Sequence, residues 1–168
     1  MVELGLQSSN DDTLRFINRG HNVKAFDDMV KKLKDNNIFV VAHIINGLPY
    51  ETKEDMINTV KHVNSLNIDS IKIHKLHVVK NTKLENIYET KKFHILTKEE
   101  YIDIVCDELE LLNPDIVIHR ITGDPKLEDL IEPNWLVKKF CVLNDIDKEL
   151  RRRNSYQGIK YKKNYTDV

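Results

Sequence analysis

The sequence predicts an α/β fold built on a parallel sheet. Strand-like and helix-like segments alternate four times, at spacings of roughly 35–45 residues, which is typical of βα units. Residues 38–45 are nearly all apolar, as in a strand that is covered on both faces. The 168 residues are too few for an eightfold barrel, which needs about 250. We therefore expect either a small open sheet or a fragment of a barrel.

Each strand and helix follows from local sequence signals. Apolar patterns predict strands at residues 2–7, 38–45, 70–77 and 116–119. Helices are predicted around Phe26–Leu33 and after three capping residues, Ser9, Thr52 and Thr97. A turn of helix at 127–131 and a long helix at 135–153 follow, whereas residues 80–95 are expected to be irregular and residues 154–168 frayed.

Composition and charge exclude several classes of protein. The 26 basic and 27 acidic residues give a formal net charge of −1, so the chain as a whole does not attract nucleic acid or a membrane surface. No apolar run approaches the ~18 residues of a membrane-spanning helix, and the first ten residues show no secretion signal, so a cytoplasmic location is expected. The two cysteines, Cys106 and Cys141, cannot form a Cys-rich metal site and are expected in the core.

Polar side chains gather on one face of the expected sheet. Because side chains alternate along a strand, Glu3 shares a face with Gln7, and Lys72 shares a face with His74. His43 lies near the carboxyl end of the second strand, where α/β folds hold ligands. One interpretation is that these groups only pair with one another, Glu3 with Lys72 for example. For the whole set we favour a ligand cavity in which Lys72 and His74 face a substrate, because a buried unpaired charge is costly.

Short motifs follow the strands. Gln7-Ser8 either aims an amide at a polar ligand or belongs to a helix-capping loop. Arg19, before Gly20-His21, either holds a carboxylate through two hydrogen bonds or only stabilises a helix end. Gly47 lets the backbone come close to a ligand. A metal site is not expected, because the spacing of His74 and His77 suits neither a strand face nor a helix face.

The C-terminal region is basic. Arginines at 151–153 and lysines at 160, 162 and 163 are interleaved with tyrosines at 156, 161 and 165. A solvated helix end and a flexible tail explain this pattern. The alternative is a patch that contacts tRNA or another RNA through charge and stacking.

Several of these segments, taken together, resemble radical S-adenosylmethionine (radical SAM) enzymes. They are ELGLQS at 3–8, NRGH at 18–21, HIINGLPYET at 43–52, KLHVVK at 75–80, VIHRITGD at 117–124 and YQG at 156–158. The chain is similar to the bacterial YhcC-like group. This group is related to the radical domain of the elongator acetyltransferase and to oxygen-independent coproporphyrinogen oxidase. The resemblance covers almost the whole chain. It implies the C-terminal half of a partial (β/α)6 barrel at residues 1–83, a helical C-terminal extension at 84–158 and a basic flexible tail at 159–168.

The resemblance also implies cofactors and site residues. In such enzymes a [4Fe–4S] cluster reduces S-adenosylmethionine to a 5′-deoxyadenosyl radical, which abstracts hydrogen from a substrate. By position, Gln7 contacts the methionine or ribose part of the cofactor, and Arg19 its carboxylate. His43 stands where relatives often have an Asp for the ribose hydroxyls. The other cofactor-side residues are Ser8 after Gln7, Ile45, Asn46 and Gly47 as a wall for the adenine, and His77 within the segment that meets the adenine edge.

The cysteines of the cluster are missing from this chain. Radical SAM enzymes hold the cluster with three cysteines spaced CxxxCxxC, a motif that is absent here. The expectation is the C-terminal half of a longer enzyme, inactive by itself, whose partner is its own N-terminal half. An exposed sheet edge is then expected, and a homodimer through that edge. The remaining alternative is a small α/β enzyme without radical chemistry that uses Lys72, His74 and His43.

Overall fold

A parallel four-stranded sheet forms the centre of the molecule. The computed structural model describes residues 1–91, 93–123, 126–137 and 139–162. The strands lie in the order β1-β2-β3-β5, and every neighbouring pair is parallel. Their bounds are β1 Val2–Gln7, β2 Val40–Asn46, β3 Ser70–Lys75 and β5 Val117–Arg120. The predicted α/β fold with a parallel sheet is therefore confirmed.

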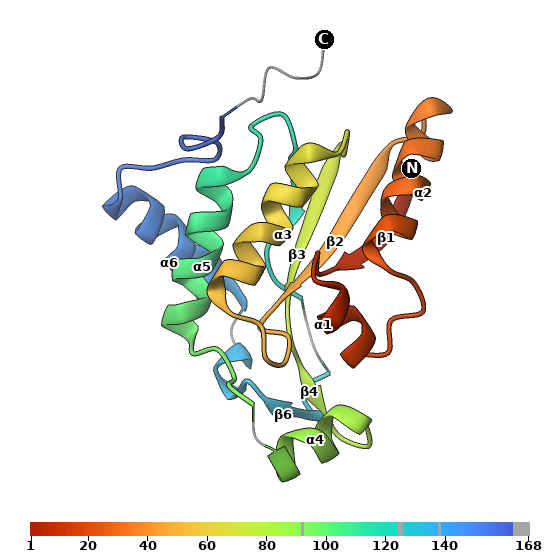
Figure 1. Cartoon of the computed structure of the whole chain (residues 1–168). Helices are drawn as coiled ribbons and strands as arrows, with labels where there is room; N and C mark the ends of the chain where they lie inside the picture. Colours follow the sequence, from red (N-terminus) through yellow and green to blue (C-terminus); the bar gives the residue numbers. More distant parts are fainter. Residues whose placement is uncertain (92, 124–125, 138, 163–168) are drawn as a thin grey trace.

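Helices connect the strands and cover one face of the sheet (Figure 1). They are α1 Asp11–Phe16, α2 Val23–Asp35, α3 Lys53–Ser65, α5 Lys98–Leu111 and α6 Lys139–Arg152. Helix α6 packs against α5. Among the described residues, none of the helices combines the length and the apolar composition that a bilayer span requires.

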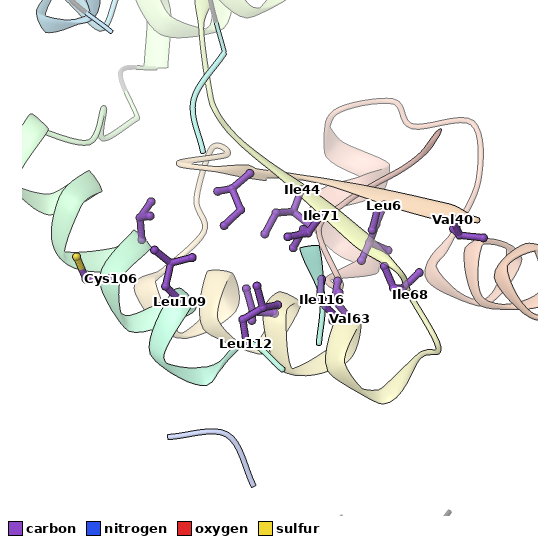
Figure 2. Packing of buried hydrophobic residues seen from close by; sticks show 14 of the residues in the cluster. Leu6, Val40, Ile44, Val63, Ile68, Ile71, Cys106, Leu109, Leu112 and Ile116 are labelled. Atoms are coloured by element: carbon purple, nitrogen blue, oxygen red, sulfur yellow. The ribbon is translucent and has the colours of Figure 1, made fainter. Parts of the chain in front are cut away.

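The hydrophobic core lies between the sheet and these helices (Figure 2). Alternate residues of the central strands point into it, as the two-residue period of a strand requires. Apolar residues at every third or fourth position of the helices meet them, as expected of amphipathic helices. The strand contribution comes mainly from Val40, Ala42, Ile44, Ile71 and Ile73, and the helix contribution from Val60, Val63, Val105, Leu109 and Leu112.

Two of the three predicted helix caps are confirmed. Thr52 and Thr97 each form a capping box, in which the hydroxyl accepts from the backbone N–H three residues on and the acidic side chain there accepts in return. The third prediction is wrong by one residue. Asn10, rather than Ser9, accepts from the backbone N–H groups of Asp12 and Thr13, whereas the Ser9 backbone N–H donates to Thr59 Oγ1.

The connection after β3 differs most from the prediction. Residues 80–95, expected to be irregular, contain helix α4 (Lys83–Lys91). Leu130–Glu132 forms strand β6 instead of a helical turn, because it pairs antiparallel with β4 (Val78–Val79). The predicted helix at 135–153 is split into a 3-10 helix, Asn134–Val137, and α6, which begins at Lys139. Figure 1 shows α4 and the β4–β6 pair beyond the carboxyl end of β3.

The chain after α6 packs back onto α5. The Gly158 backbone N–H donates to Leu109 O at 2.9 Å, and the Lys160 backbone N–H donates to Glu110 O at 2.8 Å. Gln157 Nε2 donates to the carbonyls of Asn113 and Ile116. The expectation of a frayed end is therefore wrong for residues 154–162, and residues 163–168 lie outside the described part. The boundaries proposed at residues 83 and 158 stay predictions.

Candidate functional site

The face of the sheet opposite the helices carries the polar residues, and we call it the inner face. The strand register places His43 beside Lys72, and Lys72 beside Arg120. His74 lies beside Ile45 in the same way. Together with Glu3, the inner face therefore collects the side chains of Glu3, His43, Ile45, Lys72, His74 and Arg120.

Glu3 joins two neighbouring strands through its carboxylate. Its Oε1 lies 2.6 Å from Lys72 Nζ, and its Oε2 lies 2.8 Å from His43 Nε2. The hydrogen bond from Lys72 is the main cause that lowers the pKa of Glu3. The predicted pairing of Glu3 with Lys72 is confirmed. A ligand cavity on this face stays a prediction.

Two neutral imidazoles lie side by side on the inner face. The ring centroids of His43 and His74 are 5.3 Å apart. Loss of hydration lowers the pKa of both, and for His74 the nearby cations Lys72 and Arg120 contribute, giving a pKa of about 4. Since a carboxylate can only accept, the contact with Glu3 favours the His43 tautomer with its proton on Nε2. His74 Nε2 is buried and has no hydrogen-bond partner among the described residues.

Gln7 and Arg19 converge above Gly5. A Cβ at Gly5 would overlap Gln7 Nε2 and lie 2.7 Å from Arg19 Nη2, so the ends of both side chains occupy the space that glycine leaves open. Gln7 follows a shift in the register with β2 and has a φ of 71°, which turns its amide towards the arginine. Arg19 Nη2 donates to Gly5 O at 2.9 Å, and its Nε donates to His21 Nε2 at 3.1 Å.

The remaining donors of Arg19 are available for a ligand. In the part of the chain that the structure describes, its Nη1 makes no hydrogen bond. The side chain also lines an open hollow of about 500 Å³ between α1 and α2, together with Arg15 and His21. A guanidinium with free donors at a hollow suits a carboxylate or another small anion.

Two of the predicted site residues point their side chains away from the inner face. Ser8 is buried, and its hydroxyl donates to Glu51 Oε1 and accepts from the Asn10 backbone N–H. Asn46 is buried on the helix side, where its Nδ2 donates to Glu108 Oε2 at 2.8 Å. Neither side chain contacts Gln7 or Arg19 among the described interactions. Any contact that they make with a ligand would have to come from the backbone.

The other two predicted residues, Gly47 and His77, lie beyond the carboxyl ends of β2 and β3. Gly47 has a φ of 81° and a backbone N–H 3.2 Å from Met56 Sδ. His77 lies by Gly123, where an added Cβ would be 3.6 Å from its Cε1 and 3.2 Å from His74 Nδ1. The structure thus gathers His74 and His77 around one glycine, and Gln7 and Arg19 around another.

Sequence reasoning missed a set of buried polar residues on the helix side. Lys75 and Glu108 are buried there, and the half-buried Glu51 joins the ends of β1 and β2 by accepting a hydrogen bond from Ser8. Burial raises the pKa of the Glu51 carboxyl. One signal was available for Lys75, because its place in the strand alternation puts a cation where an apolar residue is expected.

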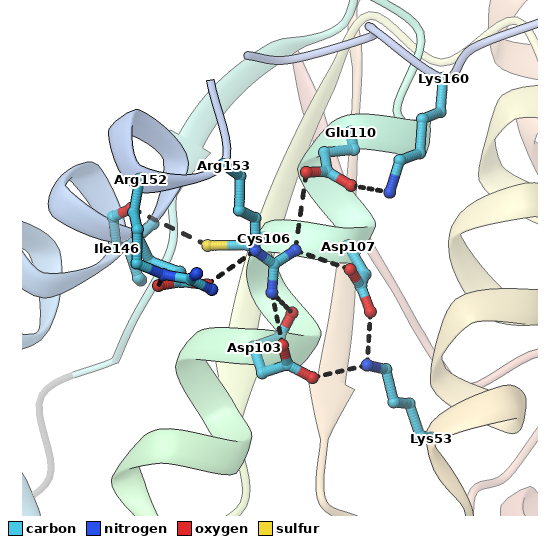
Figure 3. Close-up of polar contacts among 10 residues, drawn as sticks. Lys53, Asp103, Cys106, Asp107, Glu110, Ile146, Arg152, Arg153 and Lys160 are labelled. Atoms are coloured by element: carbon cyan, nitrogen blue, oxygen red, sulfur yellow. Dashed lines mark hydrogen bonds and ion pairs between the residues drawn. The ribbon is translucent and has the colours of Figure 1, made fainter. Parts of the chain in front are cut away.

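The basic C-terminal residues are largely paired within the chain (Figure 3). Arg153 lies 2.7 Å from Asp107 and also contacts Asp103 and Glu149. Lys160 pairs with Glu110. The other pairs are Arg151 with Asp147 and Arg152 with Glu149. The charge that motivated an RNA-contacting patch is thus mostly balanced by neighbouring carboxylates.

Comparisons with known proteins agree with this arrangement. Residues 1–63 match the Radical SAM superfamily, and residues 68–152 match the Radical SAM C-terminal domain. The chain is 45% identical over 157 residues to the uncharacterized protein YtqA of Bacillus subtilis, covering 94% of this chain and 49% of YtqA. It is 28% identical over 149 residues to the protein YhcC of Escherichia coli, covering 89% and 48%. The chain therefore spans about half the length of these relatives.

A solved structure has the same fold. The archaeal Methanocaldococcus infernus Elp3 with an N-terminal deletion (1-46) matches with a TM-score of 0.84 at 23% sequence identity. The match covers 93% of this chain and 37% of that one. The parallel sheet, its helices and the helical C-terminal segment are thus arranged as in part of a larger protein.

Proposed function

The chain belongs to the radical SAM superfamily, as its motifs predicted, and from this premise we propose that it forms the cofactor-binding C-terminal part of an enzyme that cleaves S-adenosylmethionine. The observation that supports this best is the convergence of Gln7 and Arg19 above Gly5. Both side-chain ends lie in the space that Gly5 leaves open, and the pair lies at the carboxyl end of a strand, where α/β folds bind ligands.

The residues present fit S-adenosylmethionine. Arg19 would hold the methionine carboxylate through its free donors, and the Gln7 amide would contact the methionine or ribose part. His43, kept neutral, would accept from or donate to a ribose hydroxyl, and the backbone at 45–47 would border the adenine. When bound and reduced, the cofactor supplies a 5′-deoxyadenosyl radical that abstracts a hydrogen atom. On the same face, Lys72 and His74 would then orient the substrate.

The residues of this chain do not fit a [4Fe–4S] cluster. The sequence has two cysteines, Cys106 and Cys141. Cys106 is buried, and burial raises its thiol pKa to about 11, which disfavours the thiolate that a metal needs. Among the described residues, no group of three or more His, Cys, Asp or Glu side chains could hold a metal ion. We therefore propose that the cluster ligands lie outside this chain, and we derive no reaction step through the cluster.

A chimera tests the proposed function. This chain would replace the matching half of YtqA, and the chimera would be reconstituted with iron and sulfide and reduced without oxygen. We expect it to release 5′-deoxyadenosine and methionine from S-adenosylmethionine, measured by liquid chromatography. A reconstituted, folded chimera that releases neither product would contradict the proposal. For the chain alone we expect negligible affinity, and calorimetry that gave a micromolar Kd would overturn this expectation.

A variant of Arg15, which lines the same hollow, is the matched control for a variant of Arg19. We expect Arg19→Gln in the chimera to lower kcat/KM for S-adenosylmethionine about 10- to 100-fold, because a hydrogen-bonded charge contributes about 1.5–3 kcal/mol. Arg15 lines the same hollow but is exposed and pairs with Asp12. Arg15→Gln should change kcat/KM less than threefold. Equal losses in the two variants would remove Arg19 from the proposed site.

A further inference from the structure

A buried polar layer lies where β2 and β3 end, on the side of the sheet that faces the helices. Along both strands the earlier helix-facing residues are apolar and fully buried, as in Ile44 and Ile73. At the last register pair this changes, because Asn46 lies beside Lys75. Both are buried, with 1% and 4% of their surface exposed. Polar residues therefore replace the apolar core at the strand ends that border the candidate site.

Helix α5 holds Asn46 through a carboxyl group. Glu108 is completely buried, and its Oε2 accepts a hydrogen bond of 2.8 Å from Asn46 Nδ2. Loss of hydration raises the pKa of Glu108 to about 8, so the side chain carries a proton at neutral pH and no buried charge has to be stabilised. Its Oε1 has no partner among the described residues.

Lys75 is held by the segments that follow. Its Nζ donates to Thr122 Oγ1 and lies 5.7 Å from the ring centre of Tyr101 and 5.2 Å from that of Trp135. Trp135 is fixed in turn, because its Nε1 donates to Leu96 O at 3.0 Å. Cation–π contacts of this kind are strongest away from water.

The two strand ends are joined directly beyond this layer. The Leu76 backbone N–H donates to Asn46 O at 2.8 Å, and Gly47 follows with a φ of 81°. The side chain of Asn46 thus faces Glu108 while its carbonyl holds the start of residues 76–78. The proposed function places residues 45–47 against the adenine, and by the family resemblance the backbone at 76–78 meets the adenine edge.

We propose that Glu108 is a positioning residue of the cofactor site, which acts by holding Asn46 and thereby fixes residues 45–47 against residues 76–78. This inference rests on the proposed function. Packing alone does not call for a carboxyl at this place, because an apolar side chain of similar volume would fill it without an unsatisfied oxygen. The hydrogen bond also joins the segment at 1–63, which matches the superfamily, to the C-terminal domain at 68–152.

Amide hydrogen exchange in the full chain tests the inference without any cofactor. Glu108→Leu removes the acceptor at similar volume, and we expect the Leu76 amide to exchange at least tenfold faster while the Val60 amide in α3 is unchanged. Glu108→Gln keeps an acceptor for Asn46, so Leu76 should stay within threefold of the wild type. The matched control is Glu110→Leu, because Glu110 is equally buried on α5 but pairs with Lys160.

The outcomes separate a positioning role from general destabilisation. Unchanged exchange at Leu76 in a folded Glu108→Leu variant would overturn the inference, as would the same acceleration in Glu110→Leu. If Glu108→Leu does not fold, Asn46→Ala removes the donor instead and must accelerate Leu76, or the inference fails.

A kinetic measurement in the YtqA chimera separates this inference from the proposed function. There we expect Glu108→Leu to raise KM for S-adenosylmethionine about tenfold with kcat within twofold, and Glu108→Gln to restore it. An inactive chimera would contradict the proposed function. An active chimera with an unchanged KM would contradict the positioning role alone.

Discussion

The inner face shows how single residues set one another's charge. Glu3 is ionised because Lys72 donates to it, and its Oε2 lies 2.8 Å from Nε2 of a neutral His43. His74 stays neutral because its surroundings are desolvated and two cations are close. A substrate on this face would therefore meet an imidazole that donates or accepts a hydrogen bond rather than a second positive charge.

His74 should make folding stability depend on pH. Its pKa is about 4 in the folded chain and 6.5 when unfolded, so only the unfolded state takes up a proton between these values. The contribution of His74 to the free energy of unfolding should therefore be fully present above pH 6.5 and should decrease as the pH falls to 4. After allowance for solvent screening, we expect His74 to account for roughly 1–2 kcal/mol of this loss.

Urea unfolding at pH 7 and at pH 4.5 measures this dependence. The His74→Gln variant should lose less stability over the interval than the wild type, since the carboxylates that titrate there are common to both. Identical losses in the two proteins would show that His74 titrates normally in the folded chain.

The residue-level predictions succeeded where one rule was sufficient. Strand alternation placed Glu3 and Lys72 on one face, and the pairing that it offered as one interpretation is confirmed across the intervening strand β2. The same rule puts Asn46 on the face of Ala42 and Ile44, where it meets α5, although the resemblance assigned it to the wall of the adenine. Finding Glu108 required knowing which helix covers that strand end, and local sequence does not contain this information. The roles of Gln7, Arg19, His43 and the other site residues stay predictions.

At the scale of elements, the capping boxes fix where two helices begin. In α5 the Thr97 hydroxyl accepts from the Glu100 backbone N–H, and the Glu100 carboxylate accepts in return. This start sets the rotation of α5, and therefore which residues face the sheet. Tyr101 and Glu108 both point there and are fully buried.

Removing this cap should weaken the fold by a measurable amount. We expect Thr97→Ala to lower the free energy of unfolding by about 1 kcal/mol in urea denaturation, because a helix N–H loses its acceptor. Thr90 lies in the last turn of α4 and does not cap a helix N-terminus. Thr90→Ala should stay within about 0.5 kcal/mol of the wild type, and a larger effect there than at Thr97 would contradict the assignment.

The charged cluster around Arg153 fastens the end of α6 to α5 (Figure 3). The guanidinium contacts Asp103, Asp107 and Glu149, and 15% of its side chain is exposed. On the opposite side, Lys53 of α3 pairs with Asp103 and Asp107. One arginine and one lysine thus connect three helices through two shared aspartates.

Arg153→Met should therefore destabilise the chain strongly. We expect a loss of about 2 kcal/mol in the free energy of unfolding, because Asp107 and Glu149, 25% and 20% exposed, each lose a hydrogen-bonded cation and keep only an exposed one. The neighbouring Arg152 is exposed and, among the described residues, pairs with Glu149 alone, so Arg152→Met should cost less than about 1 kcal/mol. Thermal and urea denaturation of both variants measure the difference, and equal losses would exclude a special role for Arg153.

The elements that were predicted correctly are those that bury one clear face. The helix at 98–111 and the strand at 40–46 have strong apolar patterns, and their positions agree within two residues. Helix α4 has no buried residue, so no periodic signal marks it. Strand β6 is three residues long and exists because β4 lies beside it, which no local pattern reveals.

At the scale of the whole molecule, the described strands form an open sheet with two edges rather than a closed barrel. In the described part of the chain, β1 and β5 form its two edges. Of the helices that the structure describes, none crosses the inner face, whereas α3 and α5 cover the opposite face (Figure 1). Both features agree with the expectation of a barrel fragment, and the match to part of the Elp3 structure supports the same architecture.

An open edge at β1 should lead to self-association. Unpaired backbone groups on an edge strand are a template for another strand, so we expect the isolated chain to form a dimer whose fraction rises with concentration. Sedimentation equilibrium over a hundredfold range of concentration measures this. A monomer at every concentration would count against pairing through β1.

The two cysteines differ so much in environment that the chain carries one natural attachment point for a probe. The expected core position is confirmed for Cys106, whose burial raises its thiol pKa to about 11, and is wrong for Cys141, which lies exposed on α6. Because the thiolate is the reactive form, a maleimide dye at neutral pH should modify Cys141 alone. The assembly of this chain with a second polypeptide can then be followed by fluorescence from α6 without introducing or removing a cysteine.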